Sequence, residues 1–255
     1  MMERRREMMV DRLRIEVYPD RQRMGESAGR AVARQLRRLL ADQDNVRMVF
    51  AAAPSQNEFL SCLREEEGID WKRVTAFHMD EYIGLLPGAP QFFSRYLQDR
   101  LFDHVRPGTV HFMHSEGEVS KECARYGELV REAPIDIVCL GIGENGHLAF
   151  NDPPVADFND PHTVKIVALD PSCRQQQVND GCFASYNKVP THALTLTIPA
   201  LMAGRFLYCS VPGAAKRNAL TALRSGPVNT ACPASILRTH SACRLFADMD
   251  AYGME

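Results

Sequence analysis

Two polar segments follow predicted strands and contain side chains that could move protons. The first, Phe77–Tyr82, lies at the carboxyl end of the predicted strand 74–78 and includes Asp80 and Glu81. In open α/β sheets the ligands bind at the carboxyl ends of the strands. Adjacent carboxylates point in different directions, so we expect at most one of the two to face a substrate. The alternative is that they cap the following turn.

The second segment, Gly141–Pro154, reads GIGENGHLAFNDPP and follows a continuous apolar run. Its Gly-x-Gly-x-x-Gly spacing is that of a dinucleotide site, which requires a helix to start at the third glycine. Pro153 and Pro154 come too soon for a helix of useful length, so we reject that site. His147, with Asn145 and Asp152 in reach, instead favours an acid–base group, because a working imidazole needs a polar partner to fix its tautomer. The alternative is a structural histidine.

Two further turns could hold an anion. Pro212–Lys216 is predicted to join a strand to a helix, and a lysine in the first turn of a helix suits a phosphate dianion. The turn 53–57 offers Ser55, Gln56 and backbone amides ahead of another helix, but it lacks glycine. The alternative for Lys216 is a solvated surface side chain.

The elements that position these segments alternate along the chain. Apolar patterns predict strands at 13–18, 46–52, 74–78, 109–114, 135–141, 163–169, 193–198, 205–211 and 243–248. Five helices are predicted between some of these strands, at 20–40 with Asp20 as its cap, 58–66, 91–102, 120–131 and 214–223. We therefore predict one α/β domain over residues 1–255, a layered fold with a largely parallel, doubly wound sheet flanked by helices. Its charged start, 1–12, is expected to be a flexible N-terminal extension.

Composition excludes several classes of function. The formal net charge is −2, which gives no electrostatic case for nucleic acid or an acidic membrane surface. No run approaches the ~20 apolar residues of a membrane span, and the charged start has no apolar signal region. The 8 dispersed cysteines form no Cys-x-x-Cys pair, which favours the reducing cytoplasm. His111 and His114 lie three apart on a predicted strand and so on opposite faces, and we predict no catalytic metal.

In order, Phe77–Leu85 (FHMDEYIGL), Gly141–Pro153 (GIGENGHLAFNDP) and Gly213–Lys216 resemble the glucosamine-6-phosphate deaminase family. The resemblance extends from about Leu13 to Asp248. The related 6-phosphogluconolactonases share the glycine–histidine turn but lack the MDEY run and the Phe-Asn-Asp-Pro ending. The resemblance implies conversion of glucosamine 6-phosphate, a phosphorylated amino sugar, to fructose 6-phosphate and ammonia without a nicotinamide, metal or pyridoxal cofactor.

The resemblance also implies roles for residues. Asp80 matches the carboxylate that moves a proton between C2 and C1, and His147 matches the residue that opens the sugar ring. Asp152 matches a carboxylate that supports the histidine, and Lys216 a phosphate ligand. These roles require the side chains of Asp80 and His147 to converge on one cavity at one rim of the sheet.

The sequence departs from the family at both ends of this site. Asn145 stands where aspartate is frequent, and Asp152 replaces a glutamate, so its contact to the histidine must be rebuilt or bridged by water. The phosphate turn becomes Ala53-Pro54-Ser55-Gln56, and a phosphate-binding arginine falls at Gln177. Arg174, about one helical turn earlier, is the expected substitute. The expected substrate-binding residues are thus Ser55, Gln56, Lys216, Arg174 and Gly143.

Three alternatives stay open. Galactosamine 6-phosphate is the nearest rival substrate. A lactonase would use His147 to activate water and leave Asp80 without a carbon proton to move. A sugar-phosphate sensor would bind without turnover. The family includes monomers and larger assemblies, so a homo-oligomer and allosteric control are both left open.

Overall fold

Two β-sheets of different kind form the framework of the computed structural model, which describes residues 6–254. The larger sheet has the strand order β1-β2-β11-β10-β7-β3-β4-β6, and the smaller has the order β5-β9-β8. The bounds of the larger sheet are β1 (Arg6–Val10), β2 (Leu13–Tyr18), β3 (Val46–Phe50), β4 (Val74–His78), β6 (Thr109–His111), β7 (Ile137–Leu140), β10 (Phe206–Val211) and β11 (Cys243–Asp248). Those of the smaller are β5 (Asp80–Ile83), β8 (Val164–Ala168) and β9 (His192–Leu196). The larger sheet is parallel except for the β1–β2 pair, and the smaller is antiparallel.

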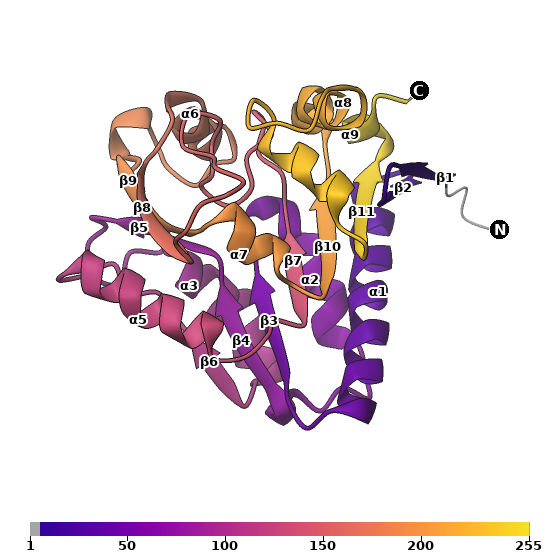
Figure 1. Ribbon diagram of the computed structural model, residues 1–255, viewed down its shortest axis with the longest axis horizontal. Coiled ribbons are helices and arrows are strands. Elements are labelled where there is room, and N and C mark those ends of the chain that lie inside the picture. Colours follow the sequence, from indigo (N-terminus) through magenta and orange to yellow (C-terminus); the bar gives the residue numbers. More distant parts are fainter. Residues whose placement is uncertain (1–5, 255) are drawn as a thin grey trace.

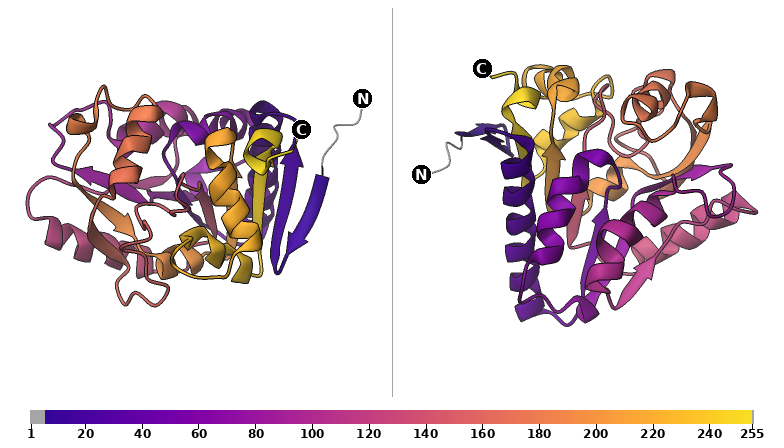
Figure 2. Two further views of the ribbon diagram at one scale, coloured as in Figure 1. Left: turned by 90° about the horizontal axis from the view of Figure 1, so that it is seen from above. Right: turned by 180° about the vertical axis from the view of Figure 1, so that it is seen from behind.

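Helices cover both faces of the larger sheet (Figure 1). The helices of the described residues are α1 (Arg21–Asp42), α2 (Asn57–Glu65), α3 (Phe93–Leu97), α4 (Asp103–Val105), α5 (Val119–Arg131), α6 (Pro171–Asn179), α7 (Ile198–Met202), α8 (Arg217–Ser225) and α9 (Met249–Tyr252), of which α6 lies with the smaller sheet. A π-helix, Gln98–Phe102, joins α3 to α4. Seen from behind, α1 and α2 lie in front of the sheet (Figure 2, right). The helices α5, α7 and α8 pack on the opposite face.

The strand sequences explain why both faces are covered. Along β3, Met48 belongs to the hydrophobic cluster beneath α1 and α2, whereas Val49 belongs to the cluster on the other face. Both side chains are buried, as expected for a central parallel strand that is apolar on both sides. Asp20 begins α1 as predicted, since its Oδ1 accepts a hydrogen bond of 2.8 Å from the Arg23 amide.

The predicted layered α/β fold with a largely parallel sheet is confirmed. One correction concerns the expected flexible extension at 1–12. Residues 6–10 form β1, an edge strand that pairs with β2, while residues 1–5 lie outside the described residues. Among residues 6–254, none of the helices has both the length and the apolar character needed to cross a membrane.

A second correction concerns the strands predicted at 163–169 and 193–198. They are strands, but they pair antiparallel with each other and with β5 in the separate smaller sheet. That sheet lies beside the larger one, together with α6 (Figure 1). The chain crosses from one sheet to the other at Met79, the single residue between β4 and β5. Sequence reasoning predicted neither β5 nor α6.

Candidate active site

A cavity opens at the rim where the parallel strands of the larger sheet end. It is lined by the turn after β3 (Ala51, Ala52, Ala53, Ser55, Gln56), the start of β5 (Met79, Asp80), Phe93, the turn after β7 (Gly141, Ile142, Gly143, His147, Ala149, Phe150), α6 (Gln176, Gln177) and Lys216 after β10. The rim at the carboxyl ends of parallel strands is the usual ligand site of open α/β sheets. The expectation that Asp80 and His147 share one cavity is confirmed.

Asp80 is the buried carboxylate of this cavity, with 7% of its surface exposed. Within the described part of the chain its Oδ1 has no hydrogen-bond partner. Burial, and then the charge of Glu81, raise the pKa of Asp80 well above its ordinary value. A poorly solvated carboxylate is a stronger base, which suits a group that takes a proton and returns it.

The neighbouring Glu81 has a different, structural position. Its Oε1 accepts hydrogen bonds of 3.0 Å from the amides of Tyr82 and Phe93, and its Oε2 accepts from the amide and hydroxyl of Ser94 at 3.0 and 2.9 Å. It therefore caps the start of α3. Burial raises the pKa of Glu81 to about 7, against these hydrogen bonds, which lower it. As expected, at most one of the adjacent carboxylates faces the cavity, and it is Asp80.

His147 is held from behind by two polar side chains. Its Nδ1 lies 2.9 Å from Oδ1 of Asp152 and 2.8 Å from Oδ1 of Asn145. Asn145 Nδ2 donates to the same Asp152 oxygen at 2.8 Å. A proton on Nδ1 satisfies both oxygens, which leaves Nε2 as the acceptor for a ligand. The shorter Asp152 thus reaches the histidine directly, with no bridging water.

The charge on Asp152 is secured by the same contacts. Burial raises the pKa of its carboxyl group, but the hydrogen bond and charge of His147, with hydrogen bonds from Asn145 and Cys173, outweigh that effect and lower it. An ionised Asp152 stabilises the imidazolium that forms whenever Nε2 takes a proton. Asn145 and Asp152 are absent from the cavity lining and act through His147.

Gly143 leaves the space in which the imidazole lies. A Cβ atom at this position would meet Cε1, Nδ1 and Nε2 of His147 at 2.1, 2.2 and 2.3 Å. No side chain fits there without moving the ring. Three residues on, Gly146 has φ +85°, which favours glycine and turns the chain so that His147 points back over Gly143.

A single strand of the smaller sheet supports both groups. In β9, Thr195 pairs with Asp80 across the β5–β9 ladder. The hydroxyl of Thr195 also accepts a hydrogen bond of 3.1 Å from the Phe150 amide, and Asn151 Nδ2 donates to the Leu196 carbonyl at 2.9 Å. Both Phe150 and Asn151 belong to the loop that carries His147. Asp80 and the loop of His147 are therefore both attached to β9, and both through Thr195.

The remaining polar lining of the cavity carries little charge. Lys216 is 6% exposed and ends a short 3₁₀ turn before α8. Burial lowers its pKa, partly offset by the charges of Asp180 and Glu144. Apart from the histidine, Lys216 is the one cationic side chain among the described residues that line the cavity. Gln56 and Gln177 also line the cavity, and Gln56 Oε1 has no partner within the range 6–254.

The expected role of Arg174 is corrected by its position. Its Nη2 donates to the carbonyls of Tyr186 at 3.1 Å and Val189 at 2.8 Å. Its guanidinium carbon lies 4.1 Å from the centre of the Tyr186 ring. The side chain is thus engaged away from the cavity lining, because it ties α6 to the following loop. The helix presents Gln176 and Gln177 to the cavity instead.

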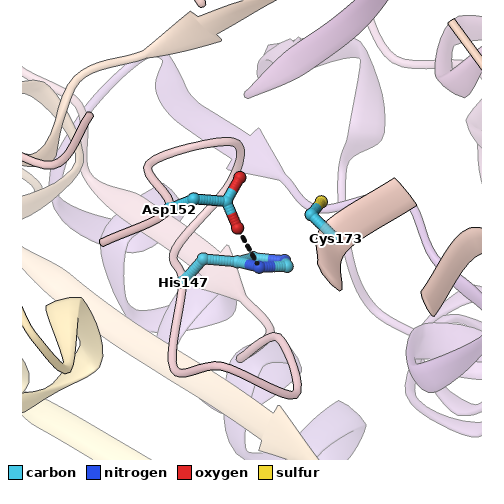
Figure 3. Close-up of side chains that lie close together, drawn as sticks. All are labelled: His147, Asp152 and Cys173. Atoms are coloured by element: carbon cyan, nitrogen blue, oxygen red, sulfur yellow. Dashed lines mark ion pairs between the residues drawn. The ribbon is translucent and has the colours of Figure 1, made fainter. Parts of the chain in front are cut away.

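Sequence reasoning did not select the aromatic and thiol groups around the site. Phe93 and Phe150 line the cavity, with ring centres 5.7 Å apart. Cys173, on α6, is 1% exposed. Its sulfur and ligand atoms of His147 and Asp152 all lie within 4.8 Å of one another (Figure 3). Sequence spacing gave no signal, because α6 is brought to the histidine loop only by the fold.

Comparison with known proteins agrees with this geometry. Residues 19–245 match the family of glucosamine-6-phosphate isomerases/6-phosphogluconolactonase. Glucosamine-6-phosphate deaminase 1 of Giardia intestinalis is 39% identical over 197 residues, 75% of this chain and 72% of that protein. A glucosamine-6-phosphate deaminase of Alkaliphilus metalliredigens is 31% identical over 244 residues, 94% of this chain and 98% of that protein.

Solved structures give the same fold. A monomeric glucosamine-6-phosphate deaminase superposes with a TM-score of 0.86 at 25% identity, covering 94% of this chain and 99% of that one. A 6-phosphogluconolactonase of Thermotoga maritima superposes with a TM-score of 0.74 at 23% identity, covering 92% and 98%, and shows the shared fold alone. This chain belongs to the glucosamine-6-phosphate isomerase/6-phosphogluconolactonase family.

Proposed function

We propose that this protein converts glucosamine 6-phosphate to fructose 6-phosphate and ammonia. The observation that carries the proposal is the buried, unpartnered carboxylate of Asp80 in the same cavity as a positioned His147. Lactone hydrolysis needs an activated water molecule, but it needs no base that removes a proton from carbon. The relatives named glucosamine-6-phosphate deaminase add support, as does the contact of Asp152 with the histidine.

Ring opening is assigned to His147. Its Nε2 takes the proton from the anomeric O1 hydroxyl and returns a proton to O5 as the C1–O5 bond breaks. The imidazolium formed between these transfers is stabilised by Asp152, which accepts from Nδ1–H at 2.9 Å. Asn145 fixes the same ring edge. The product is the open-chain aldehyde, with its amino group on C2.

Isomerisation and loss of ammonia are assigned to Asp80. Its carboxylate removes the C2 proton, giving an enolamine across C1 and C2, and then delivers that proton to C1. The resulting C2 imine adds water, and its C2–N bond breaks to release ammonia and leave the ketone. One base serves two adjacent carbons, which suits a carboxylate whose pKa is raised by burial.

The distal phosphate is assigned to the end of the cavity that contains Lys216. A buried ammonium next to hydroxyl and amide donors, here Ser55, Gln56 and Gln177, suits an anion excluded from bulk water. Gly143 also lines the cavity, and it leaves the space over which the ring of His147 lies. All 8 cysteines are free thiols, which supports action in the reducing cytoplasm.

The test is product analysis with a small panel of substrates. Purified protein is incubated separately with glucosamine 6-phosphate, galactosamine 6-phosphate and 6-phosphogluconolactone. We expect ammonia and fructose 6-phosphate from the first at the highest kcat/KM. A higher kcat/KM for galactosamine 6-phosphate would identify that sugar, instead of glucosamine 6-phosphate, as the preferred substrate. Lactone hydrolysis alone, or binding of fructose 6-phosphate without turnover, would overturn the proposal.

A further inference from the structure

His147, Asp152 and Cys173 present one nitrogen, one oxygen and one sulfur to a common point. All three residues are buried, and their ligand atoms lie within 4.8 Å of one another. Figure 3 shows the side chain of Cys173, on α6, beside the carboxylate and imidazole of the histidine loop. Asp152 is 0% exposed, and its carboxylate accepts hydrogen bonds from His147, Asn145 and the Cys173 thiol, with no further donor to Oδ2 within residues 6–254. A buried carboxylate, imidazole and thiol that already lie together form a set of donors that a cation can take up once the thiol loses its proton.

We propose that these three side chains form a binding site for a thiophilic divalent cation of the Zn²⁺ class, and that its occupancy inhibits the enzyme. Such a cation takes thiolate, imidazole and carboxylate ligands at about 2.0–2.3 Å in tetrahedral geometry. Donor atoms already within 4.8 Å of one another need only small side-chain movements to reach that arrangement. Mg²⁺ and Ca²⁺ prefer sets of oxygen ligands and are poor candidates.

The inhibition follows from the tautomer of His147, and this part rests on the proposed function. Metal on Nδ1 displaces the proton that now points to Asp152 and Asn145. The neutral ring then carries its proton on Nε2, and the thiol proton of Cys173 leaves to solvent. A ring with Nε2–H can no longer accept the proton of the anomeric hydroxyl. Because the metal lies behind the ring, we expect kcat to fall while KM changes little.

Binding can be measured without activity. Chelator-treated protein is titrated with Co²⁺, whose bond to a thiolate gives a near-ultraviolet charge-transfer band. We expect a band that saturates at one equivalent, is lost in Cys173→Ala, and has at least about tenfold weaker affinity in Asp152→Asn. Cys182→Ala is the matched control, a partly exposed free thiol just beyond α6. A band that survives Cys173→Ala or disappears in Cys182→Ala would overturn the site.

Activity supplies the second measurement. Each variant is assayed with Zn²⁺ against its own metal-free rate, so that any change in basal activity cancels. We expect a lower kcat in the parent and in Cys182→Ala, and resistance in Cys173→Ala. Equal inhibition of Cys173→Ala would contradict the proposal. If Cys173→Ala fails to fold, Cys173→Ser and the Co²⁺ affinity of Asp152→Asn decide. If the protein gives the Co²⁺ band but does not turn over glucosamine 6-phosphate, the metal site is supported and the proposed function is rejected.

Discussion

The two ends of the cavity are built differently. At the catalytic end, His147 contacts Asn145 and Asp152 within 2.9 Å, and the imidazole lies over a glycine that leaves no space to spare. At the anion end, one lysine stands among glutamines. A phosphate carries about −1.5 to −2 charges at neutral pH, so Lys216 neutralises only part of it. On the proposed function, proton transfer therefore depends on fixed geometry, whereas affinity for the phosphate depends on a single charge.

Replacement of Asp80, the proposed base, should reduce kcat more than any other change considered. Asp80→Asn keeps the shape of the side chain but cannot accept the C2 proton, so we expect kcat to fall about 10²- to 10⁴-fold with little change in KM. Steady-state kinetics with glucosamine 6-phosphate provide the measurement. Glu81→Asp is not a suitable control, because Glu81 caps α3. An unchanged far-ultraviolet circular dichroism spectrum and an unchanged melting temperature would show that Asp80→Asn folds. Full activity of Asp80→Asn would show that Asp80 takes no part in the reaction.

The second effect tests the geometry of the catalytic end. Gly143→Ala places a Cβ about 2 Å from the imidazole atoms and must displace the ring. We expect kcat to fall about 100-fold, because a misplacement of about 1 Å has that effect on a catalytic group. Gly127→Ala is the control, since Gly127, like Gly143, has no positive φ and an added Cβ there meets nothing closer than the flexible end of Arg131, at 3.2 Å. Equal losses in both variants would show that displacement of the His147 ring is not responsible.

The third effect tests the anion end. Lys216→Gln removes the one ammonium group of the cavity lining, and a hydrogen bond to a charged group is worth about 1.5–3 kcal/mol. We therefore expect KM for glucosamine 6-phosphate to rise about 10- to 100-fold while kcat stays within a few-fold. The exposed Lys188→Gln is the matched control. A fall in kcat with KM unchanged would place Lys216 at the reacting carbons instead.

The smallest effect concerns pH. The base must be ionised, so kcat/KM falls as pH drops through the pKa of Asp80, which burial and then the Glu81 charge raise. Glu81→Gln removes that charge and lowers the pKa, so the acid limb of the pH profile should move to lower pH by less than about one unit. Loss of one acceptor at the start of α3 should cost about 1–3 kcal/mol of stability. A shift of the acid limb of the profile to higher pH would contradict the electrostatic coupling between Glu81 and Asp80.

The parts predictable from the sequence are those that local pattern determines. The strand at 13–18, the cap at Asp20 and the strand before Gly141 follow from apolar periodicity and from hydrogen bonding within a few residues. Asp80 and His147 were identifiable because each follows an apolar strand. The carboxyl ends of parallel strands then meet at the same rim.

The rest depends on contacts between distant residues. Segment 77–83 reads as one strand and a turn, but it is divided between two sheets because β5 pairs with β9, more than a hundred residues later. The helix α6 has a weak apolar pattern, and its proline start follows a cap at Asp170 that local reasoning did not identify. Arg174 was assigned by its spacing from Gln177 alone, whereas the carbonyls of Tyr186 and Val189 determine where its side chain lies.

The shared attachment to β9 has a consequence for how this enzyme can fail. Side chains alternate between the faces of a strand, so a slip of one residue in the β5–β9 ladder would turn Asp80 away from the cavity. The same slip would carry the hydroxyl of Thr195 away from the Phe150 amide and release the loop of His147. Damage to the three-stranded sheet should therefore abolish ring opening and carbon-proton transfer together. Intermediates that would indicate the loss of only one of these two steps should not accumulate.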